Sequence, residues 1–224
     1  MLDQLLAHPG VVEMCELRSR FGLMAFHGGN LERGTDIIAA AAAEAAGASL
    51  YAVCQPTDLC WHIPSVAIDP AASPALARFL AHVETVVAVH GYGRAGLWTT
   101  LLLGGRNRVL AARLRAALER GLGDGFAVVD DLARIPDGLR GQHPRNPVNL
   151  PRTAGVQLEL PPRVRQGTDA PTFRPAYESA IVDALATVAR AGRDGVGGVA
   201  GIGGVAGIGE PDRGWPPSAV PWAP

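Results

Sequence analysis

A run at positions 85–91, Thr-Val-Val-Ala-Val-His-Gly, constrains the fold more than any other part of this sequence. Its centre is continuously apolar and rich in β-branched side chains, which is typical of a strand buried on both faces. Four other segments also have the character of strands, namely 22–26, 49–54, 126–131 and 155–161.

Helical segments separate these strands. The patterns of apolar residues, capping residues and terminal glycines predict helices over 36–47, 74–82, 107–121 and 174–192. Strands that alternate with helices predict an α/β fold, with a mostly parallel sheet between two layers of helices. In such a sheet, ligands bind at the carboxyl ends of the strands.

Composition bounds the domain organisation and the partners. The chain has 224 residues, of which 48% are hydrophobic, enough for the core of one α/β domain. The formal net charge is −1, so bulk charge gives no reason to expect nucleic-acid or membrane binding. Residues 193–224 repeat Gly-Gly-Val-Ala-Gly-Ile and end in a proline-rich stretch. This composition predicts a flexible tail after a domain formed by residues 1–192.

The sequence also carries signals about the compartment. Its first ten residues lack the basic and apolar regions of a secretory signal, and no apolar stretch is long enough to span a bilayer. We therefore expect a cytoplasmic protein. The three cysteines, Cys15, Cys54 and Cys60, are an odd number without close pairing, which argues against a disulfide scaffold. Cys54 and Cys60 could be zinc ligands, but no CxxC pair supports them, and we expect them to be small, partly buried thiols.

Two histidines stand where a ligand site is expected. His27 and His90 each lie at the carboxyl end of a predicted strand, and a glycine follows each of them, so the chain can turn sharply there. Glu32 follows His27 across a glycine-containing loop. Zinc hydrolases commonly hold the metal with three nitrogen or oxygen ligands and leave a fourth position for water. His27, Glu32 and His90 meet that requirement.

A zinc hydrolase also needs a separate carboxylate that accepts a proton from water. Alternate side chains of a strand share a face, so in the segment 155–161 Gln157 and Glu159 point one way, and the neighbouring apolar residues point the other. A glutamate within such an apolar strand is costly to bury without a reason. Glu159 is therefore the candidate general base.

Each of these four residues also has a plainer interpretation. His27 and His90 can be buried histidines bonded to backbone, Glu32 can be a carboxylate favoured near a helix start, and Glu159 can face water on an edge strand. The expected gathering of all four on one sheet favours the metal site.

Five segments carry a resemblance to a known family: HGGNLERGT, LCWHIPS, VHGYG, LGGRN and NPVNLPRTAGVQLELPPRVR. They occur in the order found in the poly-γ-glutamate hydrolase family of bacilli and their phages, and the resemblance covers roughly residues 20–190. That family is similar in fold to the zinc carboxypeptidases. The resemblance implies a three-layer α/β/α sandwich with a mixed, mostly parallel sheet.

The resemblance also implies an activity. It implies a Zn²⁺ ion held by His27, Glu32 and His90, with Glu159 as general base, and cleavage of γ-glutamyl amide bonds in poly-γ-glutamate or related γ-glutamyl peptides. Such a substrate is rich in carboxylates, which a guanidinium can bind through two parallel hydrogen bonds.

Candidates for binding this substrate come from the matched segments. The leading ones are Arg106, His62, Asn107 and Gln157. Further arginines that can bind a carboxylate are Arg94, Arg152, Arg163 and Arg165.

Two other functions remain open. A zinc amidohydrolase or carboxypeptidase acting on another small acyl-amino acid or a cell-wall-type peptide would use the same residues. A non-catalytic binding protein of the same fold would not need a general base, and the presence of Glu159 counts against it.

Overall fold

The computed structural model describes residues 1–165 and 173–196. Seven strands form one sheet with the order β1-β3-β2-β4-β7-β5-β6. The strands are β1 (Val12–Glu16), β2 (Phe21–Gly29), β3 (Ser49–Gln55), β4 (Thr85–Gly91), β5 (Thr100–Leu103), β6 (Ala127–Val129) and β7 (Gly155–Leu160). The α-helices are α1 (Leu2–Leu6), α2 (Thr35–Ala46), α3 (Pro74–His82), α4 (Arg108–Leu122) and α5 (Pro175–Val196).

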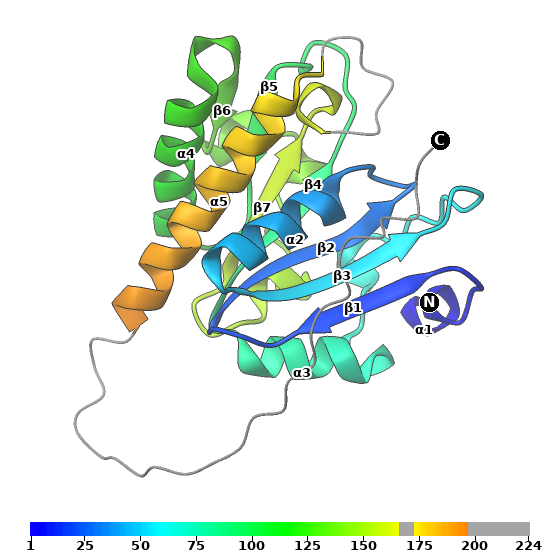
Figure 1. Ribbon diagram of the computed structural model, residues 1–224. Helices are drawn as coiled ribbons and strands as arrows, with labels where there is room; N and C mark the ends of the chain where they lie inside the picture. The colour runs from blue at the N-terminus through cyan, green and yellow to red at the C-terminus, as the bar shows by residue number, and fades with distance from the viewer. Residues whose placement is uncertain (166–172, 197–224) are drawn as a thin grey trace, which may run out of the picture.

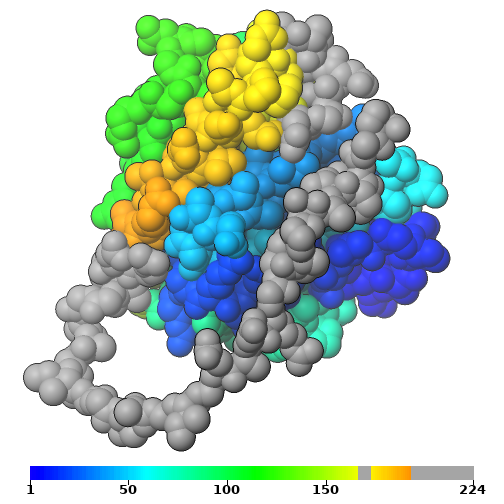
Figure 2. All heavy atoms as spheres, in the orientation of Figure 1, coloured from blue at the N-terminus to red at the C-terminus, as the bar shows by residue number. Residues whose placement is uncertain are grey.

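Helices cover both faces of this sheet (Figure 1). On one face α2, α4 and α5 pack against the strands and close over them, as the space-filling view in Figure 2 shows. On the other face lie α1, α3 and several short 3₁₀ segments. The predicted three-layer α/β/α sandwich is therefore confirmed.

The sheet is mixed and mostly parallel, as predicted. Strand β2 pairs in parallel with β3 and β4, β4 pairs in parallel with β7, and β5 pairs in parallel with β6. The antiparallel pairs are β1 with β3 and β5 with β7.

Strand β4 has the double-sided burial expected from its sequence. Val87 and Val89 belong to the core under α2, α4 and α5, whereas Val86 and Ala88 belong to the core on the α3 face. Strand β7 obeys the predicted alternation, because Val156, Leu158 and Leu160 all enter the first core. The carboxyl ends of the parallel strands β2, β4 and β7 therefore lie side by side, with chemically active side chains available toward the α3 face.

Several boundaries differ from the sequence-based expectations. Strands β1 and β5 were not predicted, because β1 is a partly buried edge strand and β5 has only four residues. Helix α5 continues to Val196, beyond the predicted end of the domain at residue 192. The rest of the predicted tail, from residue 197 onwards, lies outside the described residues.

The cysteines and the helices bear on two further expectations. All three cysteines are free, but Cys60 is exposed in the loop after β3, where we had expected a partly buried thiol. Within residues 1–165 and 173–196, no helix is long and apolar enough to cross a membrane.

Candidate metal centre and active site

His27 lies near the carboxyl end of β2, where the strand is irregular. The register with β3 shifts between Ala25 and Gly28, and this bulge re-aims the side chain that follows. The bend also needs Gly29, which has a φ of +68° and lies so close to β3 that an added Cβ would be 2.1 Å from the carbonyl oxygen of Gln55. A glycine pair is thus required to deliver His27 to the end of the sheet.

The two ring nitrogens of His27 have different partners. Its Nε2 lies 2.9 Å from the carbonyl oxygen of Ile63, and its Nδ1 lies 2.8 Å from Glu32 Oε1. Because a carbonyl oxygen only accepts hydrogen bonds, Nε2 carries the proton. A backbone carbonyl thus fixes the ring through Nε2, and Nδ1 is the nitrogen that faces Glu32, as in a metal-ligating histidine oriented through its other nitrogen.

Glu32 joins the ends of β2 and β4. Its second oxygen, Oε2, accepts a hydrogen bond of 2.8 Å from the Gly91 amide and lies 3.5 Å from His90 Nδ1. The carboxylate of Glu32 therefore stands between two imidazole rings whose Nδ1 atoms both face it. The ring centroids of His27 and His90 are 5.1 Å apart.

The electrostatics of this cluster favour a charged carboxylate. Burial alone would raise the pKa of Glu32, but hydrogen bonds and charge from His27 and His90 hold it well below its usual range. Burial would likewise lower the pKa of His90, but its hydrogen bond and charge interaction with Glu32 raise it instead. The cluster is therefore a strong binding site for positive charge, and the protons of its own histidines supply such charge.

The donor set fits a zinc ion. Two imidazoles and one carboxylate are a typical set for hydrolytic zinc. Among the described residues, Nε2 of His90 is buried and has no hydrogen-bond partner. This is the ring nitrogen that faces away from Glu32, so it adds to the cost of burying His90, and the fit to zinc rests on the donor set itself.

His62 lies against the same cluster. Its ring centroid is 4.8 Å from that of His27, and ligand atoms of His27, Glu32 and His62 lie within 4.8 Å of one another. Burial and the charge of His27 lower the pKa of His62, so its neutral, ligand-competent form is favoured. We had expected His62 to bind substrate, to assist the oxyanion or to support a ligand, and the geometry makes it a competing candidate for the third ligand.

Glu159 lies beside this cluster on β7. In the parallel pairing of β4 and β7 it is the register partner of His90, and its side chain is only 3% exposed. Burial raises the pKa of the Glu159 carboxyl; the charge of His90 opposes this rise and that of Glu32 adds to it. A buried carboxyl with a raised pKa next to a metal-type cluster has the properties of a general acid–base residue.

A chain of side-chain amides supports Glu159. Gln157 donates from Nε2 to Glu159 Oε1 at 2.7 Å, and Asn146 donates from Nδ2 to Gln157 Oε1 at 2.8 Å. Gln157, expected to bind substrate, is therefore engaged within the protein. Asn146 was missed in the sequence, where the Asn-Pro pair that begins a turn was the available signal.

Two of the expected substrate residues lie elsewhere. Arg106 and Asn107 follow β5, which runs antiparallel to β7, so they meet the amino end of β7 and not the end near Glu159. The side chain of Asn107 caps α4, with its Oδ1 accepting from the Leu110 amide at 3.0 Å. The structure does not bring these two residues to the histidine cluster.

The further arginines have different surroundings. Arg152 forms an exposed ion pair with Glu84 near the amino end of β7, whereas Arg165 is buried beside the cluster. Arg94 is exposed in the loop after β4, and Arg163 is partly buried in the 3₁₀ segment η7 (Pro162–Val164).

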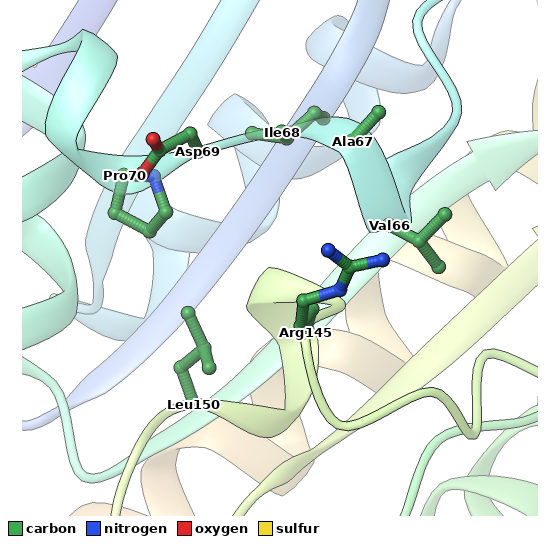
Figure 3. Close-up of a pocket in the computed structure, with 7 residues that line it drawn as sticks. All are labelled: Val66, Ala67, Ile68, Asp69, Pro70, Arg145 and Leu150. Atoms are coloured by element: carbon green, nitrogen blue, oxygen red, sulfur yellow. The ribbon is translucent and has the colours of Figure 1, made fainter.

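A surface cleft of about 390 Å³ lies on the α3 side of the sheet (Figure 3). It is lined by residues 66–70, Arg145 and Leu150, and the Arg145 guanidinium points across it toward Val66. Asp69 also lines this cleft, where one of its oxygens accepts from the Ala71 amide at 2.9 Å and caps a 3₁₀ turn.

Both walls of the cleft connect to the histidine and glutamate cluster. One wall begins three residues after Ile63, whose carbonyl contacts His27. The other includes Arg145, directly before Asn146, which holds Gln157 and through it Glu159. The cleft was not foreseen from the sequence, because the two loops that form it are far apart in the chain.

The fold and the cluster of histidine and glutamate side chains at its strand ends give the class of this protein. It is an α/β/α protein with a mixed seven-stranded sheet, a fold that it shares with a solved bacteriophage hydrolase. Within that class, the chain belongs to the poly-gamma-glutamate hydrolase family, whose sequence pattern matches residues 6–170. The resemblance found in the sequence is thereby confirmed, and the protein is a hydrolase.

Solved structures give the same fold. A bacteriophage poly-gamma-glutamate hydrolase superposes with a TM-score of 0.60 at 23% identity, covering 82% of this chain and 93% of that chain. A protein called YNDL, in a zinc-free apo form, superposes with a TM-score of 0.60 at 26% identity, covering 77% and 86%. A metallo-carboxypeptidase from Pseudomonas aeruginosa is more distant, with a TM-score of 0.45 at 14% identity over 84% and 66%. No curated protein matches the sequence.

Proposed function

We propose that this hydrolase is zinc-dependent and cleaves γ-glutamyl amide bonds, in poly-γ-glutamate or related γ-glutamyl peptides. The observation that carries the proposal is the pairing of His90 with Glu159 across β4 and β7, beside the His27–Glu32 contact. The family and the bacteriophage neighbour support the substrate class, and the zinc-free state named for the second neighbour supports the metal.

His27, Glu32 and His90 would hold the zinc ion. A zinc ion there supplies Lewis acidity, which polarises a carbonyl group and makes water more acidic. Glu159 accepts a proton from the attacking water as the oxygen of that water bonds to the amide carbon. The protonated Glu159 then gives this proton to the amide nitrogen as the C–N bond breaks, leaving a carboxylic acid and an amine.

The surroundings of Glu159 suit both proton transfers. A raised pKa makes the Glu159 carboxylate a better proton acceptor than an exposed glutamate, and keeps its acid form a competent donor near neutral pH. The hydrogen bond from Gln157 fixes one carboxyl oxygen, so the side chain needs no reorientation between the steps.

Carboxylates of the substrate need a cationic partner. Arg106 remains a candidate, and we add Arg145, because it lines the cleft and directly precedes Asn146, which holds Gln157 beside Glu159. No described residue forms an ion pair with the Arg145 guanidinium, so its fork of donors is open to a substrate carboxylate. His62 is exposed next to His27 and can contact the scissile region of the substrate.

The test combines metal content, activity and substrate range. Wild-type protein purified without chelators should contain close to one zinc per chain by plasma mass spectrometry, and His27→Ala should contain little. Glu159→Gln should keep its zinc and lose about 10²- to 10⁴-fold in kcat on poly-γ-glutamate. An active Glu159→Gln variant would refute the general-base role.

A substrate panel separates the alternatives. Release of oligomers from poly-γ-glutamate or glutamate from γ-glutamyl peptides is the expected result. Turnover only of N-acyl-amino acids or cell-wall-type peptides would retain the zinc chemistry and reject the γ-glutamyl substrate. Tight substrate binding with no turnover of any amide would identify a binding protein.

A further inference from the structure

Arg165 is a buried arginine in a position that the proposed reaction does not use. Its side chain is 5% exposed, although arginine is among the residues least often fully buried. It follows β7 by five residues, just after the 3₁₀ segment η7 (Pro162–Val164), which turns the chain back toward the sheet. A guanidinium in such a place needs hydrogen-bond acceptors close by.

The carbonyl groups that it contacts belong to the neighbours of two site residues. Its Nε donates to the carbonyl oxygen of Leu160 at 3.2 Å, and its Nη1 donates to the carbonyl oxygen of Arg33 at 2.5 Å. Leu160 directly follows Glu159, and Arg33 directly follows Glu32. One planar side chain therefore links the end of β7 to the loop that carries Glu32.

The chain segment that carries His90 lies against the flat face of the Arg165 guanidinium. A Cβ added to Gly91 would be 2.5 Å from Cζ of Arg165 and 2.7 Å from its Nη1. Gly91 directly follows His90, and its amide donates to Glu32. The absence of a side chain at this position lets the guanidinium lie on the backbone at the end of β4.

The charge of Arg165 also suits this place. Burial lowers its pKa, whereas the negative charges of Glu32 and Glu159 oppose that effect. A permanent cation behind two buried carboxylates offsets part of their mutual repulsion.

We propose that Arg165 is a positioning residue, which holds the three chain segments that carry Glu32, His90 and Glu159 at the spacing required for metal binding. The inference rests on the proposed zinc site. It assigns Arg165 to the protein's own framework, although the sequence had offered it as a contact for substrate carboxylates.

Arg108, at the start of α4, provides a matched control. It is also a partly buried arginine that donates to backbone carbonyls, including those of Leu103 and Gly104 at 3.0 and 3.1 Å. Arg108→Gln removes comparable hydrogen bonds, but none of its acceptors adjoins Glu32, His90 or Glu159 in the chain. A loss shared by both variants therefore reports general destabilisation.

The experiment measures zinc affinity by competition with a chromophoric chelator, together with thermal unfolding. We expect Arg165→Gln to weaken zinc binding by about 10- to 100-fold, as loss of a group supporting metal ligands typically does, and Arg108→Gln to leave the affinity unchanged. Arg165→Lys keeps the charge but cannot reach both carbonyls, so it should fold and still bind zinc more weakly than wild type. A folded Arg165→Gln or Arg165→Lys variant with wild-type zinc affinity would overturn the proposal.

A second readout does not depend on zinc. In ¹⁵N spectra of histidine side chains of the metal-free protein, Arg165→Lys should shift or broaden the His27 and His90 resonances, whereas Arg108→Gln should not. Absence of zinc binding by the wild type would reject the proposed function alone, because these spectra still decide the role of Arg165. Unchanged histidine spectra in Arg165→Lys would reject the positioning role even if the wild type binds zinc.

Discussion

Glu159 illustrates how a single residue can be costly for the fold and useful for chemistry. Its carboxyl group lies in the sheet beside His90 and Glu32, with one hydrogen bond from Gln157. Burial raises its pKa, so the folded protein favours the protonated form more than the unfolded chain does. The stability that this group contributes is therefore fully present below its pKa in the unfolded chain, about 4.3. It is lost as the pH rises through the pKa of the group in the folded protein.

The metal-free protein should reveal this cost. We expect Glu159→Gln to raise the melting temperature of chelator-treated protein at pH 8, and the gain to vanish near pH 4, where wild-type Glu159 is protonated too. Calorimetry at both pH values measures the difference, and Glu44→Gln, at an exposed position, should change little at either. An equal gain at both pH values would show that ionisation of Glu159 is not the cause.

The third metal ligand can be decided by a pair of substitutions. His90 is buried on β4 and faces Glu32, whereas His62 is exposed on a loop. We expect His90→Ala to lose most of its zinc, and His62→Ala to retain close to one zinc per chain with a several-fold higher KM. Metal analysis and steady-state kinetics of the two proteins check this. The reverse pattern of zinc contents would assign the ligand role to His62.

At the scale of single residues, the sequence predicted that four side chains gather at one place, but it did not predict the contacts that hold them. His27, Glu32, His90 and Glu159 do gather, because strand periodicity and glycine turns are local features of the sequence. The contacts of His27 with Ile63 and of Gln157 with Asn146 join distant segments, and no local pattern encodes them. The same reason explains why Asn107, chosen from a matched segment, lies at the opposite end of β7.

Strand β2 is the element on which the site depends most. Its regular part packs into both cores, and its last residues bend to deliver His27. The strand was predicted to end at residue 26, but its ladder continues to Gly29, because glycines can pair across a bulge where bulkier residues would clash. Long buried strands were predicted well, whereas the short strand β5 and the edge strand β1 lack a distinctive pattern.

Two glycines with similar backbone angles test this dependence. Gly29 has a φ of +68° and no room for a Cβ, whereas Gly96 has a φ of +82° with no atom within 4 Å of an added Cβ. Gly29→Ala should cost well over about 1 kcal/mol of unfolding free energy, and Gly96→Ala only about 1 kcal/mol, the penalty of the backbone angle itself. Urea denaturation of both variants gives the comparison. Equal losses would mean that the contact with β3 is unimportant.

In the whole molecule, the proposed ligands tie together separate parts of the chain. Residues 27, 32 and 90 come from β2, the loop after it and β4. Bound metal should therefore stabilise the entire domain, by about 2.7 kcal/mol when free zinc is a hundredfold above its dissociation constant. Thermal unfolding with and without chelator should show a lower melting temperature without metal. Chelator should leave the melting temperature of His27→Ala unchanged. An unchanged melting temperature in the wild type as well would argue against zinc binding to the folded state.

The fold as a whole was largely predictable from the sequence, since alternating strands and helices leave few ways to bury two apolar faces. The antiparallel placement of β5 against β7 was not, because β5 pairs with a strand that comes more than fifty residues later in the chain, and no local pattern encodes that pairing. The cleft lined by Arg145 depends in turn on two such connections.

The register between β4 and β7 has a consequence for how new specificities can arise. His90 and Glu159 are held opposite each other by the backbone ladder, whereas the cleft is built by loop residues 66–70 and 145–150 outside the sheet. The pair proposed for the reaction and the residues that line the cleft thus lie in separate stretches of the chain. Substitutions at residues 66–70 and at Arg145, with Asn146 kept because it holds Gln157 and through it Glu159, are therefore the natural route to a relative with the same reaction and a different substrate.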